Sequence, residues 1–390
     1  MSARGTGLGT ARPARPDEAP VSWRRSIERV LTDPAGHLDL AFQPVVDLQR
    51  GVVVGYEALA RLAGPPSAPP DRWFAAAADE GLAARLEAAV LERALPIRAA
   101  LPPDCFLSVN LNPNLVLDRT VQGVLDDAGE LPGVVLELTE HDRIDDYGGL
   151  RRALTRLRAS GVNIAMDDAG AGYAGLSSLL ALRPDLVKLD RSLIAGIDVD
   201  PVKQELVELL ATMVGRMDAW VLAEGVERLE ELESLIRLGV PLAQGFLLGR
   251  PAPDLRGLDD PTAGRIRELA GTWGEGDAVA PLVEAVPAVT LGATDEARAC
   301  FAADGGLEVV PVLDRWERPV ALHRRADALA GSGPVPEVLR VQAVEPVAAV
   351  ARRAMGRPRA SRFDPVLCID GLGRYRGVVR VERLLEALAR

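Results

Sequence analysis

Acidic and amide residues and one lysine recur through the first 250 residues, each within or directly after a short apolar run. In chain order they are Gln43, Glu57, Asn110, Glu137, the pair Asp167-Asp168, Lys188, Glu224 and Gln244. All except the lysine offer oxygen ligands, which Mg²⁺ and Mn²⁺ prefer, whereas Zn²⁺ prefers His and Cys. The acids exceed what one ion needs, and a pair of divalent ions serves phosphoester displacement. The pattern therefore predicts a two-metal site.

Each of these residues also has an ordinary structural interpretation. Asp167-Asp168 precedes a glycine-rich turn and could cap a helix. Glu57 could protect a strand edge, Asn110 could begin a turn, and Lys188 could be a solvated charge. Gln43 and Gln244 could simply form hydrogen bonds. Eight such coincidences along eight strands are less expected than one shared site, and acids buried together need cations.

The elements that must position these residues alternate between strand and helix patterns. The predicted strands are Leu40–Val46, Val52–Leu59, Cys105–Leu111, Val134–Leu138, Val162–Met166, Leu186–Leu189, Trp220–Ala223 and Leu242–Phe246. Eight strands alternating with helices predict an α/β fold, a (β/α)8 barrel, whose active site lies where the strand carboxyl ends meet. Only Asp47 to Gly51 joins the first two strands, which is too short for a parallel crossover. The first strand should therefore be antiparallel and the barrel irregular.

Two segments of the sequence, together with several later motifs in the same order, resemble a known family. Gln43-Pro44-Val45-Val46, followed by Tyr56-Glu57-Ala58-Leu59-Ala60-Arg61, resembles the signature of EAL-domain cyclic di-GMP phosphodiesterases. The resemblance extends over about residues 22–256. It includes Ser108-Val109-Asn110-Leu111, Glu137-Leu138-Thr139-Glu140, Asp167-Asp168, Asp185–Asp190, Ala223–Glu227 and Gln244-Gly245-Phe246. It implies an irregular barrel with an antiparallel first strand.

The resemblance implies a metal-dependent reaction. Two divalent cations, Mg²⁺ or Mn²⁺, would be held by Glu57, Asn110, Glu137 and Asp167 for the first ion, and by Asp167, Asp168 and Glu224 for the second. A water between the metals would attack one phosphodiester of cyclic di-GMP and open the ring to linear pGpG. Lys188 would position that water, and Asp168 and Glu224 would share the catalytic role. The alternative is a non-catalytic cyclic di-GMP receptor or interaction module, although degenerate relatives of that kind typically lose metal ligands.

The resemblance also implies residues that contact the substrate or support the ligands. Gln43, Arg61 and Gln244 would contact the dinucleotide, with Arg61 forking onto a phosphate. Glu140 would anchor the loop after the fifth strand. Asp190 and Glu227 would support the ligands from behind. The resemblance further implies a homodimer.

The C-terminal part contains a near-repeat. Strand, Asp-containing turn, strand and helix occur in a first copy at about 284–330 and again in a second copy at about 338–390. The repeat resembles a tandem pair of CBS domains, which implies a regulatory or dimerising module. Asp327 would hold the ribose of a nucleotide there, or would be a simple acid at a helix N-terminus. The expected organisation is a disordered arm at 1–21, a barrel at 22–256, a linker at 257–278 and a CBS-like domain at 279–390.

Composition excludes several classes of protein. The chain has 390 residues and a net charge of −11, which argues against binding to duplex DNA or RNA. Of its 45 basic residues only Lys188 and Lys203 are lysines. The three cysteines are far apart, so no disulfide framework or zinc ribbon is predicted. With no apolar run near 18 residues and no signal-peptide pattern, we expect a cytoplasmic protein without a membrane span.

Overall fold

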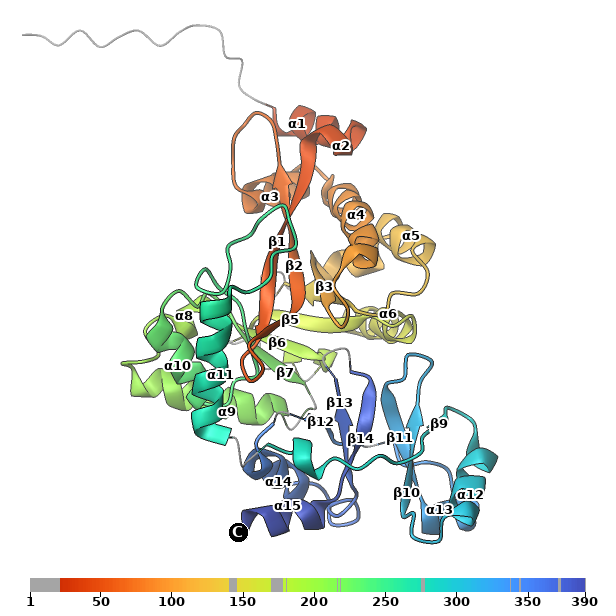
Figure 1. Cartoon of the computed structure of the whole chain (residues 1–390). Coiled ribbons are helices and arrows are strands. Elements are labelled where there is room, and N and C mark those ends of the chain that lie inside the picture. The colour runs from red at the N-terminus through yellow and green to blue at the C-terminus, as the bar shows by residue number, and fades with distance from the viewer. Residues whose placement is uncertain are drawn as a thin grey trace, which may run out of the picture.

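The computed structural model describes residues 22–139, 146–169, 178–179, 181–215, 217, 219–274, 278–336, 338–343, 345–370 and 373–389. For 168–169 and 272–274 it describes the backbone alone. The predicted arm at 1–21 lies outside these residues. Figure 1 shows a barrel with its helices above a smaller C-terminal unit.

Eight strands close into one barrel in chain order. They are β1 (Leu38–Asp47), β2 (Val52–Leu62), β3 (Phe106–Leu111), β4 (Val134–Leu138), β5 (Asn163–Ala169), β6 (Leu186–Leu189), β7 (Trp220–Ala223) and β8 (Leu242–Ala243). β1 pairs antiparallel with both β2 and β8, and the other pairs are parallel. The predicted eight-stranded irregular barrel is confirmed. The eighth strand is two residues long because the chain leaves the sheet at Gln244.

Helices surround the barrel. They are α1 (Trp23–Thr32), α2 (Pro34–His37), α3 (Pro70–Asp79), α4 (Ala83–Ala94), α5 (Arg119–Asp127), α6 (Tyr147–Ala159), α8 (Arg191–Ile194), α9 (Pro201–Gly215) and α10 (Leu229–Arg237). Short polar side chains begin several of them by accepting a backbone N–H that the helix leaves unpaired. Asp146 accepts from Gly149 before α6, and Asp190 accepts from Ser192 before α8.

One apolar residue from each strand fills the lower interior of the barrel. The layer consists of Val45, Val54, Phe106, Val135, Ala165, Leu186, Leu222 and Leu242. Side chains alternate across a strand, so a residue two positions further on also points inward, one layer higher. From β4 to β8 those positions are Glu137, Asp167, Lys188, Glu224 and Gln244. The barrel therefore carries an apolar base and a polar mouth.

The stretch predicted as a linker, 257–278, instead contains a packed helix. Helix α11 (Asp260–Gly274) lies against α10. Its Ile266 is fully buried and joins the core on that side of the barrel, together with Ala270. The sequence predicts a short helix around Ile266–Leu269 within this stretch, and α11 extends beyond it because tertiary packing stabilises its narrow apolar face.

The C-terminal unit contains two copies of one arrangement. The first copy is β9 (Val289–Thr290), α12 (Thr294–Ala303), β10 (Val309–Leu313), β11 (Pro319–Arg324) and α13 (Arg325–Leu329). The second is β12 (Arg340–Gln342), α14 (Val347–Met355), β13 (Val366–Ile369), β14 (Tyr375–Val379) and α15 (Val381–Leu388). In each, the first strand pairs parallel with the second, which forms a hairpin with the third. The sequence repeat is thus a repeat in space, extended by a strand and a helix that the pattern missed.

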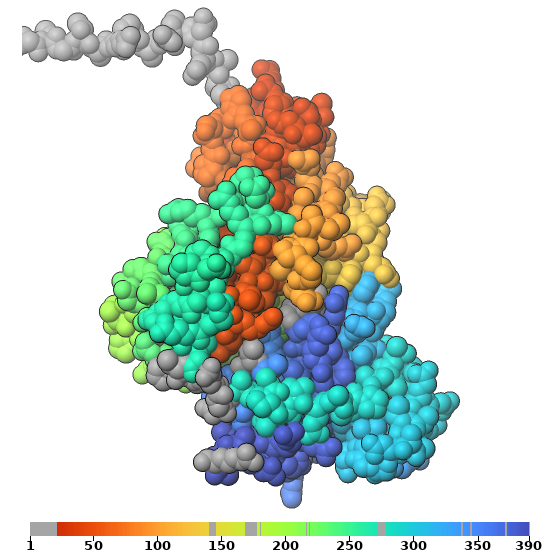
Figure 2. All heavy atoms as spheres, in the orientation of Figure 1, coloured from red at the N-terminus to blue at the C-terminus, as the bar shows by residue number. Residues whose placement is uncertain are grey.

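The C-terminal unit docks on the end of the barrel where the strands begin (Figure 1). The β10–β11 turn carries two arginines that reach the barrel. Arg315 pairs with Glu130 at 2.9 Å and donates to the carbonyl of Ala159. Arg318 donates to the carbonyls of Arg158 and Gly161 and, at 3.2 Å, to the side chain of Asn163. In Figure 2 the C-terminal unit lies directly against the barrel.

None of the helices among the described residues has the length and apolar character that crossing a bilayer requires.

Candidate active site

Four carboxylates converge on one buried ammonium at the mouth of the barrel. The Nζ of Lys188 lies 2.6 Å from Glu137 and 2.6 Å from Glu224. It lies 3.1 Å from Asp167 and 3.7 Å from Glu57. Lys188 is 1% exposed, so the interaction is screened little by water. The structure thus brings together residues from β2, β4, β5 and β6 with the residue that follows β7.

Amide side chains fix the position of Glu57. Asn110 donates to one oxygen of Glu57 at 2.8 Å, and Gln244 donates to the other. Gln244 also donates to Gln43 at 3.0 Å, and Gln43 donates to the carbonyl of Gly249. The Oε1 of Gln244 is buried without a hydrogen-bond partner among the described residues. That oxygen is available to a bound group.

A serine that the sequence patterns did not single out completes the hydrogen bonding of Glu137. The Oγ of Ser108 donates to Glu137 at 2.5 Å, and Ser108 is fully buried. Ser108 lies two residues before Asn110 on β3, so both side chains face the barrel interior. That spacing is the signal that could have identified it.

Gly245 allows the chain to turn directly after Gln244. A Cβ atom at this position would collide with the backbone N and O of Val226, which follows β7. The backbone of Val226 in turn bonds the chain after β8, donating to the carbonyl of Gln244. The close approach of these two loops holds Glu224 and Gln244 side by side at the mouth.

Burial and mutual repulsion dominate the electrostatics of the cluster. Burial and the neighbouring Glu57 raise the pKa of Glu137 well above its usual value, against the attraction of Lys188. Burial, opposed by Lys188 and reinforced by Asp167, raises the pKa of Glu224 to about 7. For Glu57, burial is outweighed by Lys188 and the amide hydrogen bonds, and its pKa is lowered.

The lysine itself is held in its charged form. Burial would lower the pKa of Lys188, but Glu137, Glu57 and the other carboxylates outweigh burial and raise that pKa well above its usual value. Four carboxyl groups around one ammonium cannot all be ionised in a buried space without further cations, and the raised pKa values of Glu137 and Glu224 reflect this.

The donor set fits divalent cations. The buried carboxylates, the amide oxygens of Asn110 and Gln244 and the uncompensated charge are the chemistry that Mg²⁺ or Mn²⁺ takes. Within the described part of the chain, no three His, Cys, Asp or Glu side chains already stand together as a metal cage. The ammonium of Lys188 lies at the centre of the four carboxylates instead.

Other predicted residues lie around the cluster or outside it. The side chain of Asp168 and the whole of Glu140 lie outside the described residues. Arg61, four residues beyond Glu57 on β2, is exposed and donates to the carbonyl of Ala60. Asp190 caps α8, and Glu227 pairs with Arg191 at 2.8 Å. These two acids flank the mouth without a hydrogen bond to the cluster among the described residues.

Asp327 lies far along the chain, at the start of α13. Its carboxylate is 3.5 Å from the guanidinium of Arg324, which pairs more closely with Asp364. This contact is that of an acid in the first turn of a helix, one of the two interpretations of its sequence position.

Comparison with known proteins adds independent evidence. The EAL domain model matches residues 24–251. The cyclic di-GMP phosphodiesterase RocR of Pseudomonas aeruginosa is 30% identical over 234 residues, which cover 57% of this chain and 60% of RocR. The chain spans between 27% and 61% of the length of the first curated relatives it matches.

Two solved structures are similar to the barrel. The structure of the PaMucR phosphodiesterase in complex with cyclic di-GMP has a TM-score of 0.53 and 30% identity, and the match covers 60% of this chain and 98% of that one. The manganese and cyclic di-GMP complex of Klebsiella pneumoniae BlrP1 has a TM-score of 0.51 and 33% identity, covering 58% of each chain. With a family match over more than half of its length and a closed barrel with a polar mouth, this chain belongs to the EAL-domain family.

Proposed function

We propose that this chain is a metal-dependent phosphodiesterase that hydrolyses cyclic di-GMP to linear pGpG. The observation that carries the proposal is the convergence of Glu57, Glu137, Asp167 and Glu224 on Lys188 at the mouth of an EAL-family barrel. The named activity of RocR and the cyclic di-GMP bound in the PaMucR and BlrP1 structures support this substrate.

Two divalent cations, Mg²⁺ or Mn²⁺, would complete the site. Their ligands would be Glu57, Asn110, Glu137, Asp167, Asp168 and Glu224. When bound, such ions neutralise charge on a phosphodiester and lower the pKa of water toward neutrality. The manganese in the BlrP1 complex supports this proposal.

The chain's own residues bind and orient. The surrounding carboxylates raise the pKa of Lys188, and in its charged form Lys188 would act as a fixed positive charge. It holds Glu137 and Glu224 in place and offsets part of the negative charge that the substrate brings. Gln244 and Asn110 orient Glu57, and the Oε1 of Gln244 remains for a substrate or water hydrogen bond. Arg61, exposed at the rim, would contact a phosphate of the dinucleotide.

The test is turnover of cyclic di-GMP. The purified full chain is incubated with cyclic di-GMP and Mn²⁺, and pGpG is followed by chromatography. We expect pGpG to form, EDTA to abolish its formation, and Glu57→Gln to remove it because the variant loses a charged ligand while keeping the side-chain shape. If the wild type and Glu57→Gln are equally inactive while cyclic di-GMP still binds in EDTA, the chain is a receptor and the proposal is wrong.

We also propose that the chain forms a homodimer and that its C-terminal unit is a tandem CBS-like regulatory module. The spatial repeat of the C-terminal unit supports the proposed CBS-like module.

The proposed homodimer is supported by helix α9, which presents Val202, Leu206 and Leu209 to solvent, and Val202 is 71% exposed. Apolar side chains grouped on a surface are typical of an interface. A sedimentation experiment that finds only monomer at micromolar protein would contradict the dimer.

A further inference from the structure

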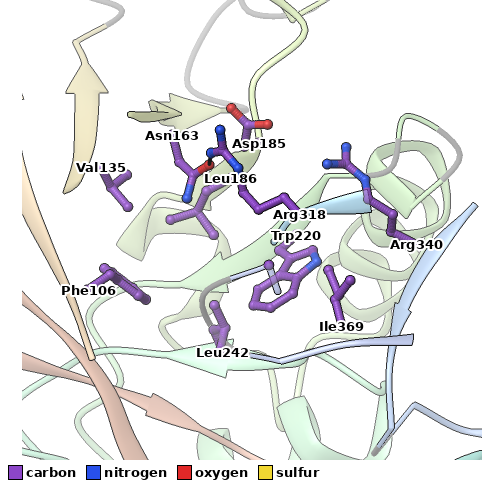
Figure 3. Close-up of a pocket in the computed structure, with 11 residues that line it drawn as sticks. Phe106, Val135, Asn163, Asp185, Leu186, Trp220, Leu242, Arg318, Arg340 and Ile369 are labelled. Atoms are coloured by element: carbon purple, nitrogen blue, oxygen red, sulfur yellow. Dashed lines mark hydrogen bonds between the residues drawn. The ribbon is translucent and has the colours of Figure 1, made fainter. Parts of the chain in front are cut away.

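A cavity of about 1010 Å³ lies between the base of the barrel and the C-terminal unit, at the opposite end of the barrel from the mouth. The barrel lines it with the end of α6 and the turn before β6. The C-terminal unit lines it with the β10–β11 turn, β12 and the end of α14. Its volume is that of a small-molecule site. A smaller cavity beside it shares Asn163, Asp185, Arg318 and Arg340, which Figure 3 shows together at the barrel base.

The cavity concentrates positive charge in an acidic protein. Among the described residues, six arginines line it, and two aspartates, Asp185 and Asp314, oppose them. The arginines are Arg158, Arg183, Arg318, Arg340, Arg353 and Arg357. The chain as a whole carries −11, so this excess is not a property of the average surface. Like charges gathered around a hollow attract an anion.

Several of these arginines form ion pairs and hydrogen bonds with other residues around the cavity. Arg158 pairs with Asp185 at 3.3 Å and donates to the carbonyl of Leu182. Arg353 pairs with Glu345 at 2.7 Å and donates to the carbonyl of Arg340. Together with the contacts of Arg318 to the barrel, these bonds fix both sides of the cavity.

Two arginines of the cavity lack such contacts among the described residues. The guanidinium groups of Arg183 and Arg340 make no hydrogen bond or ion pair with other described residues. Arg183 stands on the barrel side, in the turn before β6, and Arg340 on the C-terminal side, as the first residue of β12. In Figure 3 the guanidinium of Arg340 lies apart from the contact between Arg318 and Asn163. One cation from each unit is therefore available to a ligand between them.

We propose that this cavity binds a multiply charged phosphate compound of nucleotide size, which Arg183 and Arg340 hold from opposite sides. A guanidinium presents paired N–H donors that match phosphate oxygens. The site differs from the one expected at Asp327, which does not line the cavity and contacts Arg324. It is also separate from the barrel mouth, where the negative charge repels a polyphosphate in the absence of metal. A bound ligand would bridge the barrel and the C-terminal unit.

The test is isothermal titration calorimetry of the full chain in EDTA, with ATP and inorganic triphosphate as separate probes. EDTA keeps metals from drawing either probe to the barrel mouth. We expect saturable binding of one or both probes. Equal affinities would identify the phosphate chain as the recognised group, and tighter binding of ATP would show that the nucleoside contributes as well.

Matched variants locate the site. Arg340→Gln and Arg183→Gln should each weaken binding about tenfold, the cost of one charge-assisted contact. Arg93→Gln makes the same change of charge on the exposed face of α4, away from the cavity, and should bind as the wild type does. Melting temperatures check that all three variants are folded. Binding of neither probe at millimolar concentration, or wild-type binding by the Arg183→Gln/Arg340→Gln double variant, would overturn the proposal.

Discussion

At the scale of single residues, the ammonium of Lys188 occupies a position that suits a compact charge. Two carboxylate oxygens lie 2.6 Å from Nζ, and the side chain is almost fully buried. A guanidinium is wider and planar, and it presents its donors in a fixed fork. The chain otherwise uses arginine for 43 of its 45 basic residues, so lysine at this position departs from its general composition.

Lys188→Arg should therefore reduce turnover of cyclic di-GMP by about a hundredfold, the typical cost of losing one preorganised donor. The wider group would displace Glu137 and Glu224 from their present positions. Steady-state kinetics with Mn²⁺ measures the effect. The control is Lys203→Arg, the same change at the other lysine. Lys203 lies in α9 and donates to the carbonyls of Ser192 and Ala195, in and just after α8. Equal activities in the two variants would show that the lysine at 188 has no special role.

Most of the mouth could be predicted from residue type and position. Glu137 and Lys188 stand within apolar runs short enough to be strands, and Glu224 and Gln244 directly follow such runs, so barrel geometry alone brings them together. Ser108 was missed because a serine inside a strand has no distinctive chemistry until its partner, Glu137, is in view. The pairing of Asp327 with Arg324 also depends on a fold that the motif does not determine.

At the scale of elements, the strands agree closely with the pattern, and the exceptions have physical causes. Three strands, β4, β6 and β7, have the predicted bounds because each is an apolar run ended by a polar residue. β9 and β12 were missed because strands of two or three residues carry no periodicity to detect. The sequence predicts only a short helix around Ile266–Leu269, and α11 is longer because a helix stabilised mainly by packing needs only a few apolar residues.

The junction between β7 and β8 supplies a prediction of its own. Gly245→Ala should lower the free energy of unfolding by about 1–3 kcal/mol, because the new methyl group would overpack against the backbone of Val226. The accompanying shift of Gln244 should also reduce activity. Urea denaturation measures the first effect, and the pGpG assay measures the second.

The matched control for this change is Gly257→Ala, an exposed position where an added Cβ meets nothing within 4 Å. It should leave stability and activity near those of the wild type. If Gly245→Ala is as stable as Gly257→Ala, the two loops are not held as closely as the structure indicates.

At the scale of the whole molecule, the C-terminal unit attaches through a small number of specific contacts. The turn that carries Arg318 is itself stiffened by Asp314, which accepts from the backbone of Trp316 and Arg318 and pairs with the Arg318 guanidinium at 2.9 Å. None of this could be read from the sequence, where Arg318 is one arginine among 43. The contact depends on two surfaces that the chain brings together only after both have folded.

Arg318→Ala should loosen this attachment, because it removes the hydrogen bonds to Arg158, Gly161 and Asn163 together. Small-angle scattering should show a larger radius of gyration than in the wild type. The control is Arg325→Ala, since among the described residues the Arg325 side chain donates to carbonyls of its own unit, those of Phe301, Asp304 and Leu307. An unchanged radius in Arg318→Ala would mean that other contacts suffice to dock the unit.

Strand β5 begins at one of these contacts and passes through the polar mouth of the barrel. Asn163, its first residue, accepts from Arg318, and Asp167, four residues on, faces Lys188. A strand is close to its greatest extension, with a rise of about 3.3 Å per residue, so it can slide or tilt but cannot lengthen. A displacement along the axis of β5 at the base would therefore be carried toward Asp167, about 13 Å away, along a strand whose pairing with β6 is regular up to Met166. Strand β5 therefore connects the contact with the C-terminal unit at Asn163 mechanically to the carboxylate of Asp167 in the candidate active site.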